Sequence, residues 1–281
     1  MPSAKNGAAA EFAEFVRRWG SDKSDLPLDR ACLLVSAAFD PSVTVKPYEA
    51  MLDALAARAV ATAVDRSDPY ALMAAVLRTL FVVGEFRPND RHYHDPRNSL
   101  LSSVLDRRIG IPITLSIVTM EVSRRAGVAL QGIGLPGHFV VRFPDPTSRL
   151  YIDVFDGGRV IDVDQCVALV ERLYRGRLTW RDEYLDPVPA SAILKRVLLN
   201  LKNALSQAKN YAAALTAIGL QLTLDPDDPT ELRDRGILFA RLHRYERAIA
   251  DLEEYLQRLP DAGDGEHIRN TVHYLRQANN L

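Results

Sequence analysis

The stretch 107–156 constrains the fold more than any other, because its pattern is that of one buried helix followed by strands. Pro112 suits a first helical position, where its missing N–H would have no partner in any case. Apolar residues then recur at helical spacing, and Arg124 and Arg125 stand where the negative end of the helix dipole would lie. Gly127 is a suitable end, since glycine adopts the left-handed conformation at little cost. The pattern predicts a helix that begins at Pro112 and ends shortly before Gly127.

Four strands are expected after this helix, over 129–133, 138–143, 150–155 and 159–163, because apolar and β-branched runs are bounded there by turn residues. His138 opens the second strand and Asp153 lies in the third. A carboxylate among apolar residues is costly unless it is paired. We therefore expect Asp153 to pair with His138 across adjacent strands. The alternative for His138 is a core histidine whose ring nitrogens bond to backbone groups.

A helix followed by a histidine strand and an aspartate strand resembles the core of papain-like and transglutaminase-like thiol enzymes. In those enzymes the nucleophile stands at the helix N-terminus, the histidine is its base and the aspartate orients the histidine. His138 and Asp153 are candidates for the second and third roles, but 104–125 contains no cysteine. Thr114 and Ser116 are the hydroxyls nearest the helix start and are weak candidates for a nucleophile. The alternative, which we favour, is that both hydroxyls bond to local backbone groups.

The two cysteines of the chain, Cys32 and Cys166, are too few for a disulfide scaffold, which favours a reducing cytoplasm. Cys32 lies inside an apolar run and is expected to be a small buried hydrophobic residue. Cys166 follows Asp153 and lies on a separate helix that the sequence predicts over 164–174. The sequence leaves open whether either thiol approaches His138 in the folded chain.

His92 and His94, in the sequence HYHD, are weak candidates for metal ligands. A histidine pair of this spacing can bind zinc or copper, but a site needs three or four ligands. A solvated loop is the favoured alternative, since proline, asparagine and aspartate punctuate the whole of 85–99. The sequence has no Walker loop, dinucleotide-binding fingerprint or CxxC pair, so no cofactor is expected.

Residues 1–100 are expected to be mainly helical and to cover the central helix and the sheet. The segment 1–24 has the pattern of an N-terminal extension with one short helix. Asp29 is expected to cap the apolar helix that follows it. Asn98 or Ser99 is expected to cap the short helix that follows them.

From about residue 190 the sequence repeats itself at an offset of 34 residues. The matching pairs are Tyr211 with Tyr245, Ala214 with Ala248, Leu222 with Leu256, and Pro226 with Pro260. This offset is the period of the tetratricopeptide repeat, in which two helices form a hairpin. We expect an all-helical hairpin array over 190–281, after a linker over 183–190. Such hairpins commonly bind protein partners, and the alternative is a structural buttress, because two units are fewer than the usual three.

Charge and hydropathy narrow the classes of partner. The formal net charge of −1 gives no bias toward nucleic acid. No stretch approaches the roughly 18 apolar residues of a membrane span, and the start has no apolar region of a secretory signal. We therefore expect a protein or peptide partner, no nucleic acid, no membrane, and a cytoplasmic location.

Four motifs carry a specific resemblance to a known family. They are DPRNS at 95–99, LDRRIGIPITLS at 105–116, GLPGHFVVRF at 134–143 and YIDVFDGG at 151–158. In this order, and with the repeats behind them, they resemble the SirB-type transglutaminase-like family. The resemblance implies a transglutaminase-like domain over 25–185, with His138 and Asp153 matching the family's histidine and aspartate. Pro112 falls near the thiol position of true transglutaminases. The resemblance also implies a bacterial cytoplasmic protein, often regarded as a regulator.

The sequence thus predicts an α+β fold, in which a helical N-terminal part packs on a papain- or transglutaminase-like core of one helix and an antiparallel sheet. An all-helical array of tetratricopeptide-like hairpins follows. The favoured function is a non-catalytic module that binds a protein or peptide. The alternative is an enzyme of acyl transfer or amide hydrolysis, with a remodelled nucleophile and His138 as base.

Overall fold

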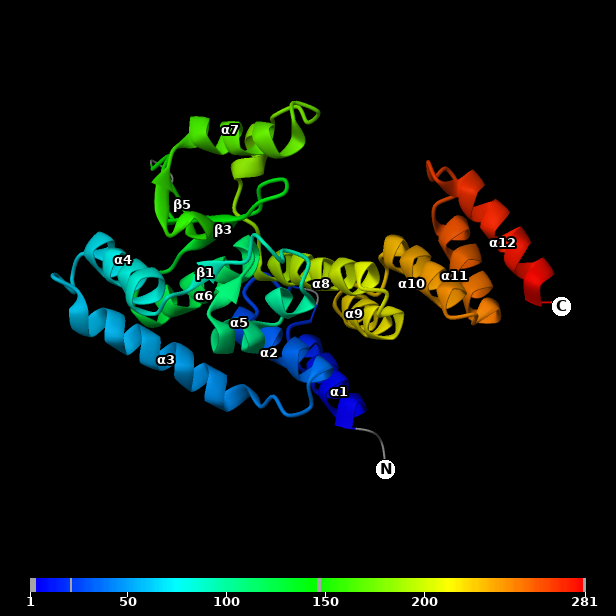
Figure 1. Ribbon diagram of the computed structural model, residues 1–281, viewed down its shortest axis with the longest axis horizontal. Helices are drawn as coiled ribbons and strands as arrows, with labels where there is room; N and C mark the ends of the chain where they lie inside the picture. The colour runs from blue at the N-terminus through cyan, green and yellow to red at the C-terminus, as the bar shows by residue number, and fades with distance from the viewer. Residues whose placement is uncertain (1–3, 21, 146–147, 280–281) are drawn as a thin grey trace. The chain divides into compact units, whose positions relative to one another are not determined.

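The structure, a computed structural model, describes residues 4–20, 22–145 and 148–279 (Figure 1). This described part is α+β, with twelve α-helices and two small sheets. The chain divides into two compact units between Val197 and Leu198, a boundary that falls inside helix α8 (Ala190–Gln207). The expected class, a helix-and-antiparallel-sheet core followed by helical hairpins, is confirmed. None of the described helices has the length and apolar character needed to cross a membrane.

Helices make up the first part of the first unit. They are α1 (Ala4–Arg17), α2 (Leu28–Phe39), α3 (Val45–Thr62), α4 (Pro69–Leu77) and a π-helical turn, η1 (Arg78–Val83). Residues 1–3 and 21 of the expected N-terminal extension lie outside the described residues. The expectation that Asp29 caps a helix is wrong. Because α2 begins at Leu28, Asp29 lies in its first turn, and the carboxylate forms an ion pair with Arg125 instead.

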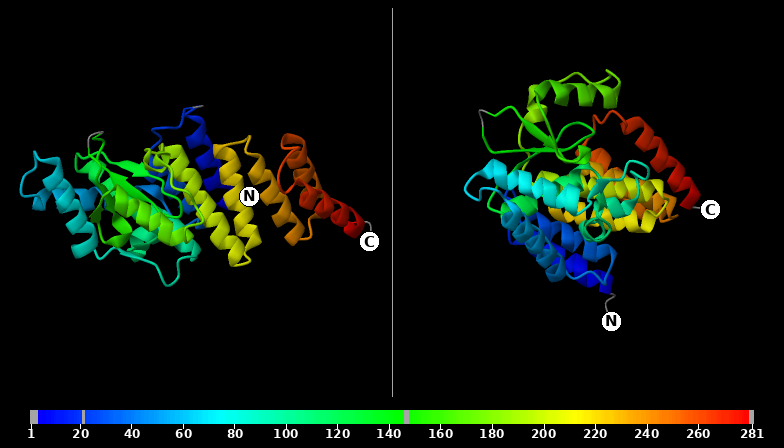
Figure 2. Two further views of the ribbon diagram at one scale, coloured as in Figure 1. Left: turned by 90° about the horizontal axis from the view of Figure 1, so that it is seen from above. Right: turned by 60° about the vertical axis from the view of Figure 1, so that its left-hand side comes forward.

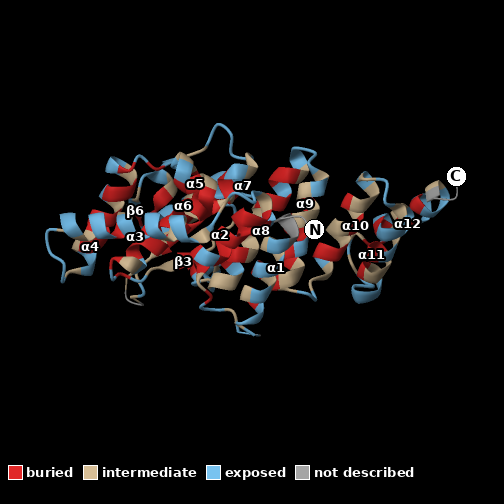
Figure 3. Ribbon diagram, turned by 90° about the horizontal axis from the view of Figure 1, so that it is seen from below, coloured by how far each residue is buried: buried red, intermediate tan, exposed pale blue. Residues whose placement is uncertain are grey.

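The central helix is α6 (Pro112–Arg125), and it begins at the predicted proline. Most of its residues are buried, because α2, α3 and α4 pack against it as well as the sheet. Figure 3 shows buried residues, in red, gathered around α2, α5 and α6. Gly127 adopts φ +93°, the left-handed conformation expected where the helix ends.

A four-stranded antiparallel sheet follows α6, in the order β3-β4-β5-β6. Its strands are β3 (Gln131–Ile133), β4 (Val140–Arg142), β5 (Tyr151–Asp153) and β6 (Arg159–Ile161). All four lie inside the predicted ranges but are shorter. Figures 1 and 2 show the sheet between α7 (Val163–Tyr174) on one side and α4 and α6 on the other. Ile133, Val140 and Tyr151 pack with Val170 of α7 in one apolar cluster.

The segment 85–99 is not a bare loop. Two residues of it, β1 (Arg87–Pro88), pair in parallel with β2 (Ile109–Gly110), and a 3₁₀ turn, η2 (Pro96–Ser99), follows. The next helix, α5 (Leu101–Arg107), has Leu100 at its N-cap position and no side-chain cap. The expectation that Asn98 or Ser99 caps it is therefore wrong, because the Asn98 side chain is engaged with loop backbone instead.

The first unit also contains two further 3₁₀ turns, η3 (Val154–Asp156) and η4 (Asp182–Leu185). The second unit is all-helical in its described residues. After the end of α8 it contains α9 (Tyr211–Leu224), α10 (Pro229–Arg241), α11 (Tyr245–Arg258) and α12 (Gly265–Asn279). Helices α9 and α11 begin 34 residues apart and end 34 residues apart, with Pro226 and Pro260 just beyond them. Ala248 is fully buried.

Gly236 allows α10 and α11 to approach each other closely. A Cβ atom at this position would lie 2.7 Å from Cγ of Leu252 and 3.1 Å from the carbonyl oxygen of Ala248. Gly219, in the middle of α9, has no atom within 4 Å of the equivalent position. The two glycines therefore separate the effect of helix packing from the effect of helix propensity.

We expect Gly236→Ala to destabilise the second unit by about 1–3 kcal/mol, because the added methyl group forces the two helices apart. Gly219→Ala is expected to stabilise it by up to about 1 kcal/mol, since alanine is the better helix former. Urea unfolding followed by circular dichroism measures both. Equal effects of the two substitutions would contradict the close approach at Gly236.

Candidate functional site

His138 and Asp153 lie side by side at one end of the sheet. Asp153 is the last residue of β5, and His138 lies just before the neighbouring strand β4. The imidazole Nε2 is 3.0 Å from Oδ1 of Asp153, and both side chains are buried. The fold thus brings these two candidate residues together, while their catalytic role stays a prediction.

The surroundings of Asp153 fix the orientation of the imidazole. Its Oδ1 also accepts hydrogen bonds from the backbone N–H groups of Phe155, at 3.0 Å, and Asp156, at 3.3 Å. A carboxylate with these donors is an acceptor toward the ring, so Nε2 of His138 carries the proton and donates. In the neutral imidazole, Nδ1 is then left with a free lone pair. Within the described residues Nδ1 has no hydrogen-bond partner, and it is not among the fully buried polar atoms.

The turn before β4 holds His138 in place. Gly137 has φ +70°, in the left-handed region, and the N–H of His138 donates to the carbonyl of Leu135 at 3.1 Å. Arg196 of α8 clamps this turn, because its Nη2 donates to the carbonyls of Leu135, at 2.8 Å, and His138, at 2.7 Å. Its guanidinium also lies 5.7 Å from the centre of the Phe139 ring.

Arg196 is a positioning residue that sequence reasoning missed. Burial lowers the pKa of its guanidinium, and the nearby Tyr93 and Tyr174 oppose this effect. The only signal in the sequence is a charged pair, Lys195 and Arg196, between apolar residues of a leucine-rich helix. That pattern marks a buried arginine with partners but does not say what the partners are.

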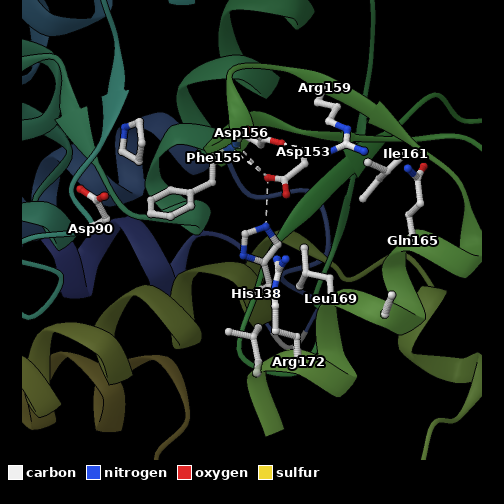
Figure 4. Close-up of a pocket in the computed structure, with 13 residues that line it drawn as sticks. Asp90, His138, Asp153, Phe155, Asp156, Arg159, Ile161, Gln165, Leu169 and Arg172 are labelled. Carbon is white, nitrogen blue, oxygen red and sulfur yellow. Dashed lines mark hydrogen bonds and ion pairs between the residues drawn. The ribbon is translucent and has the colours of Figure 1, made fainter. Parts of the chain in front are cut away.

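A pocket of about 610 Å³ opens beside the pair, within the size range of ligand sites (Figure 4). Its walls come from β5, β6, η3, one face of α7, and the segment after β1. The charged residues among its lining are Asp90, Asp153, Asp156, Arg159 and Arg172. Apolar side chains of Phe155, Ile161 and Leu169 also line it. The pocket thus combines an open imidazole nitrogen with separate acidic and basic groups.

Aromatic rings connect the pocket with the HYHD segment. Phe155 packs edge-on against His138, with ring centres 6.0 Å apart, and against Tyr93, at 6.4 Å. His94 packs on Tyr93 at 5.4 Å, and burial raises the pKa of the Tyr93 phenol. His92 and His94 line a separate shallow hollow. Among the described residues no group of three histidine, cysteine, aspartate or glutamate side chains is placed to hold a metal ion.

Asn98 organises the segment before α5 through its side chain, rather than capping that helix as the sequence predicted. Its side chain is fully buried and donates to the carbonyls of His92, at 2.9 Å, and Tyr93, at 3.1 Å. Its Oδ1 accepts from Nδ2 of Asn89 at 3.0 Å and from Arg107 at 3.3 Å. Through Asn98, the DPRNS motif therefore connects the HYHD segment with Asn89 and Arg107.

Within the described residues, the hydroxyls of Thr114 and Ser116 form no hydrogen bond with the imidazole. Thr114 follows the favoured alternative, because its Oγ1 accepts from the N–H of Ile111 at 3.1 Å and donates to the carbonyl of Asn98 at 2.8 Å. The same expectation is wrong for Ser116, whose hydroxyl does not bond to local backbone groups. Its Oγ is fully buried and has no hydrogen-bond partner in the described part of the chain.

Both cysteines are free and buried. Cys166 lies in the cluster between the sheet and α7, and burial, with a smaller contribution from Asp153, raises the pKa of its thiol to about 12. Burial likewise raises the pKa of Cys32 in α2, as expected for a small hydrophobic residue. Across the described residues, neither sulfur forms a hydrogen bond with His138.

We expect neither cysteine to react with a thiol reagent such as iodoacetamide while the protein is folded at pH 8, because the thiolate is the reactive form and both pKa values are raised. Mass spectrometry after a timed reaction measures the modification of each. The unfolded protein in urea is the positive control. Rapid modification of Cys166 in the folded protein would show that a thiol is available near the pocket.

Comparisons with known proteins agree with this architecture. A profile of the transglutaminase-like superfamily matches residues 46–199, and a tetratricopeptide repeat profile matches residues 201–273. A UPF0162 protein of Xylella fastidiosa is 34% identical over 255 residues, which cover 88% of this chain and 89% of the relative. A UPF0162 protein of Vibrio cholerae is 29% identical over 256 residues, which cover 90% and 94%.

A likeness also extends to a larger protein. F-box only protein 21 of Pongo abelii is 26% identical over 192 residues, which cover 64% of this chain and 30% of that protein. No solved structure gives a significant match. The comparisons thus bear out a transglutaminase-like domain followed by tetratricopeptide repeats.

Proposed function

The chain belongs to the transglutaminase-like superfamily, and from this premise we propose that it is a non-catalytic module that binds a protein or peptide. In this proposal the pocket at His138 and Asp153 is one binding surface, and the tetratricopeptide hairpins are a second. The SirB-type assignment and the bacterial cytoplasmic location belong to the same proposal.

One observation carries the proposal. The Nδ1 lone pair of His138 is open to the pocket, yet among the described residues no thiol or hydroxyl bonds to it. Of the two candidate hydroxyls, that of Thr114 is engaged with backbone groups, and that of Ser116 is buried without a hydrogen-bond partner among the described residues. An imidazole held in this way is a hydrogen-bond acceptor for a ligand, and it lacks the nucleophile that thiol enzymes of this fold place beside it.

The same open Nδ1 is the observation that favours the alternative function. Without a protein nucleophile, the imidazole could still remove a proton from water, as a general base in amide hydrolysis. Binding and hydrolysis make opposite predictions for a glutamine-containing peptide, so one assay separates them.

The test uses the purified full chain and a His138→Ala variant. We expect no ammonia release from a glutamine-containing peptide, and no incorporation of a fluorescent primary amine, above the level of the variant. An array of immobilised peptides then reports binding. We expect the wild type to retain a subset of peptides that His138→Leu loses, because leucine cannot accept a hydrogen bond.

Two outcomes would overturn the proposal. Catalytic product that depends on His138 would establish the alternative. Peptide binding that is identical for the wild type and His138→Leu would remove the pocket as a binding surface. Thermal unfolding of both variants checks that they remain folded.

A further inference from the structure

We propose that the pocket is bipolar and takes an extended peptide segment that has a cationic residue at one end, an apolar residue in the middle and a carboxylate at the other end. This inference rests on the proposed function and specifies the chemistry of the ligand. It follows from the placement of two unpaired charges, Asp90 and Arg172, in the lining of one pocket.

The acidic end of the pocket is Asp90. Its Oδ1 accepts a hydrogen bond from the N–H of Arg91 at 3.0 Å, and the carboxylate has no ion pair among the described residues. In Figure 4 Asp90 lies beyond Phe155, on the opposite side of His138 from Arg159 and Gln165. In this view the Phe155 ring therefore lies between Asp90 and the side of the pocket that holds Arg159 and Gln165.

The basic end of the pocket is formed by α7 and β6. Arg172 lines the pocket from α7 and makes no ion pair or hydrogen bond within the described ranges. Arg159 of β6 has one ion pair, with Asp156 at 3.4 Å. Gln165 uses its Oε1 to accept the N–H of Asp162, which leaves its amide NH₂ free to donate. This end therefore offers cations and donors to an anion.

The remaining charges of the lining are compensated locally. Asp153 accepts from His138 and two backbone N–H groups, and Asp156 is paired with Arg159. Subtracting these leaves one free negative charge, on Asp90, and one free positive charge, on Arg172. A ligand of matching opposite charges satisfies both, whereas a ligand of uniform charge meets repulsion at one end.

The middle of the pocket suits a peptide backbone and an apolar side chain. Nδ1 of His138 accepts, and a peptide N–H is a neutral donor that can reach it. Ile161 and Leu169 add apolar side chains to the lining of the same pocket. An extended segment offers these groups in sequence along its length.

The experiment uses four fluorescent heptapeptides with a central leucine and charged residues near the ends: Lys and Glu, Glu and Lys, Lys and Lys, or Glu and Glu. Fluorescence anisotropy measures the affinity of each for the full chain. Both mixed orders are included because a peptide can lie in either direction. We expect at least one mixed peptide to bind roughly tenfold more tightly than either peptide of uniform charge.

Charge reversal gives the sharper test. Arg172→Glu is expected to shift the preference toward the Lys and Lys peptide, and Asp90→Lys toward the Glu and Glu peptide. Arg177→Glu is the matched control, since Arg177 is exposed and does not line the pocket. It changes the net charge as Arg172→Glu does and should leave the preference unchanged.

The outcomes separate this inference from the proposed function. If His138→Leu weakens binding but neither charge reversal changes the preference, the pocket binds peptides and the bipolar inference is wrong. If His138→Leu has no effect on any peptide, the proposed function of the pocket is wrong. If none of the four peptides binds the wild type at millimolar concentration, the inference is overturned.

Discussion

Replacing Arg125 by methionine is expected to lower the free energy of unfolding by about 3–5 kcal/mol, because it leaves the buried carboxylate of Asp29 without its ion-pair partner and removes one of the two partners of the buried Glu121. Arg125 stands in the last turn of α6 and contacts acids on three helices. Its Nη1 is 2.7 Å from Glu121 on its own helix, its Nε is 2.7 Å from Asp53 on α3, and its Nη2 pairs with Asp29 on α2. Asp29 and Glu121 are buried.

Arg124→Met is the matched control for this substitution. Arg124 also contacts Glu121, at 2.8 Å, but more than half of its side chain is exposed. Exposed ion pairs contribute little, so we expect a loss below about 1 kcal/mol. Urea unfolding followed by the fluorescence of Trp19 and Trp180, both in the first unit, measures both variants. Equal losses for the two would mean that Arg125 does not hold the three helices together.

Lys202→Met is expected to destabilise the second unit by a similar amount, about 3–5 kcal/mol, for the same physical reason. Nζ of Lys202 lies 2.7 Å from Glu231 and 2.7 Å from Asp234, and Lys202 and Glu231 are both buried. Gln221 donates to the same oxygen of Glu231 at 2.8 Å, while the other carboxylate oxygen has no partner in the described part of the chain. Hydrogen exchange of the amides of α9 and α10 measures the loss in this unit.

The destabilisation caused by Lys202→Met is expected to depend on pH. Burial raises the pKa of Glu231 above its ordinary value of 4.5, and Lys202 opposes this effect. Because this pKa is raised, the Glu231 carboxylate binds a proton more tightly in the folded state than in the unfolded state. The free energy of unfolding therefore falls as the pH rises from 4.5 through the raised pKa of the folded state. Lys202→Met removes the opposing cation and raises this pKa further. We therefore expect the variant to lose more stability at pH 7 than at pH 5.

Asp234→Asn is the control for the Lys202 prediction. Asp234 is partly exposed and also pairs with Arg233 at 2.8 Å, so its loss leaves Lys202 and Glu231 paired. We expect a smaller effect, with little difference between the two pH values. A pH-independent loss in Lys202→Met would contradict the raised pKa of Glu231.

The elements that the sequence predicted well are those specified by local chemistry. Pro112 marks the start of the central helix because its ring fixes a helical φ at the first position. Gly127 marks its end because glycine adopts the left-handed conformation at little cost. The 34-residue period predicts the hairpins because the same helix–helix contacts recur in each repeat. The strands were located but drawn too long, since their length depends on pairing with neighbours that the sequence does not place.

The predictions that failed depend on distant partners. Asp29 and Asn98 are residue types that commonly cap helices. In the structure, however, Asp29 forms an ion pair with the distant Arg125, and the Asn98 side chain donates hydrogen bonds to loop carbonyls. Arg196 reaches the carbonyl of a residue 58 positions away, and no local pattern encodes that contact. The pairing of His138 with Asp153 could be predicted from the sequence, because a lone aspartate among apolar strand residues needs a partner and a histidine stands on the neighbouring predicted strand.

The position of Arg196 sets where the polypeptide can be shortened. A fragment that stopped at residue 185 would lack the guanidinium that holds the His138 turn, and also the N–H of Val188 that covers the outer edge of β3 through Gly132. It would thus present a bare strand edge, a known route to aggregation. A truncated protein intended to keep the pocket should therefore extend through Val197, into the helix that also opens the repeats.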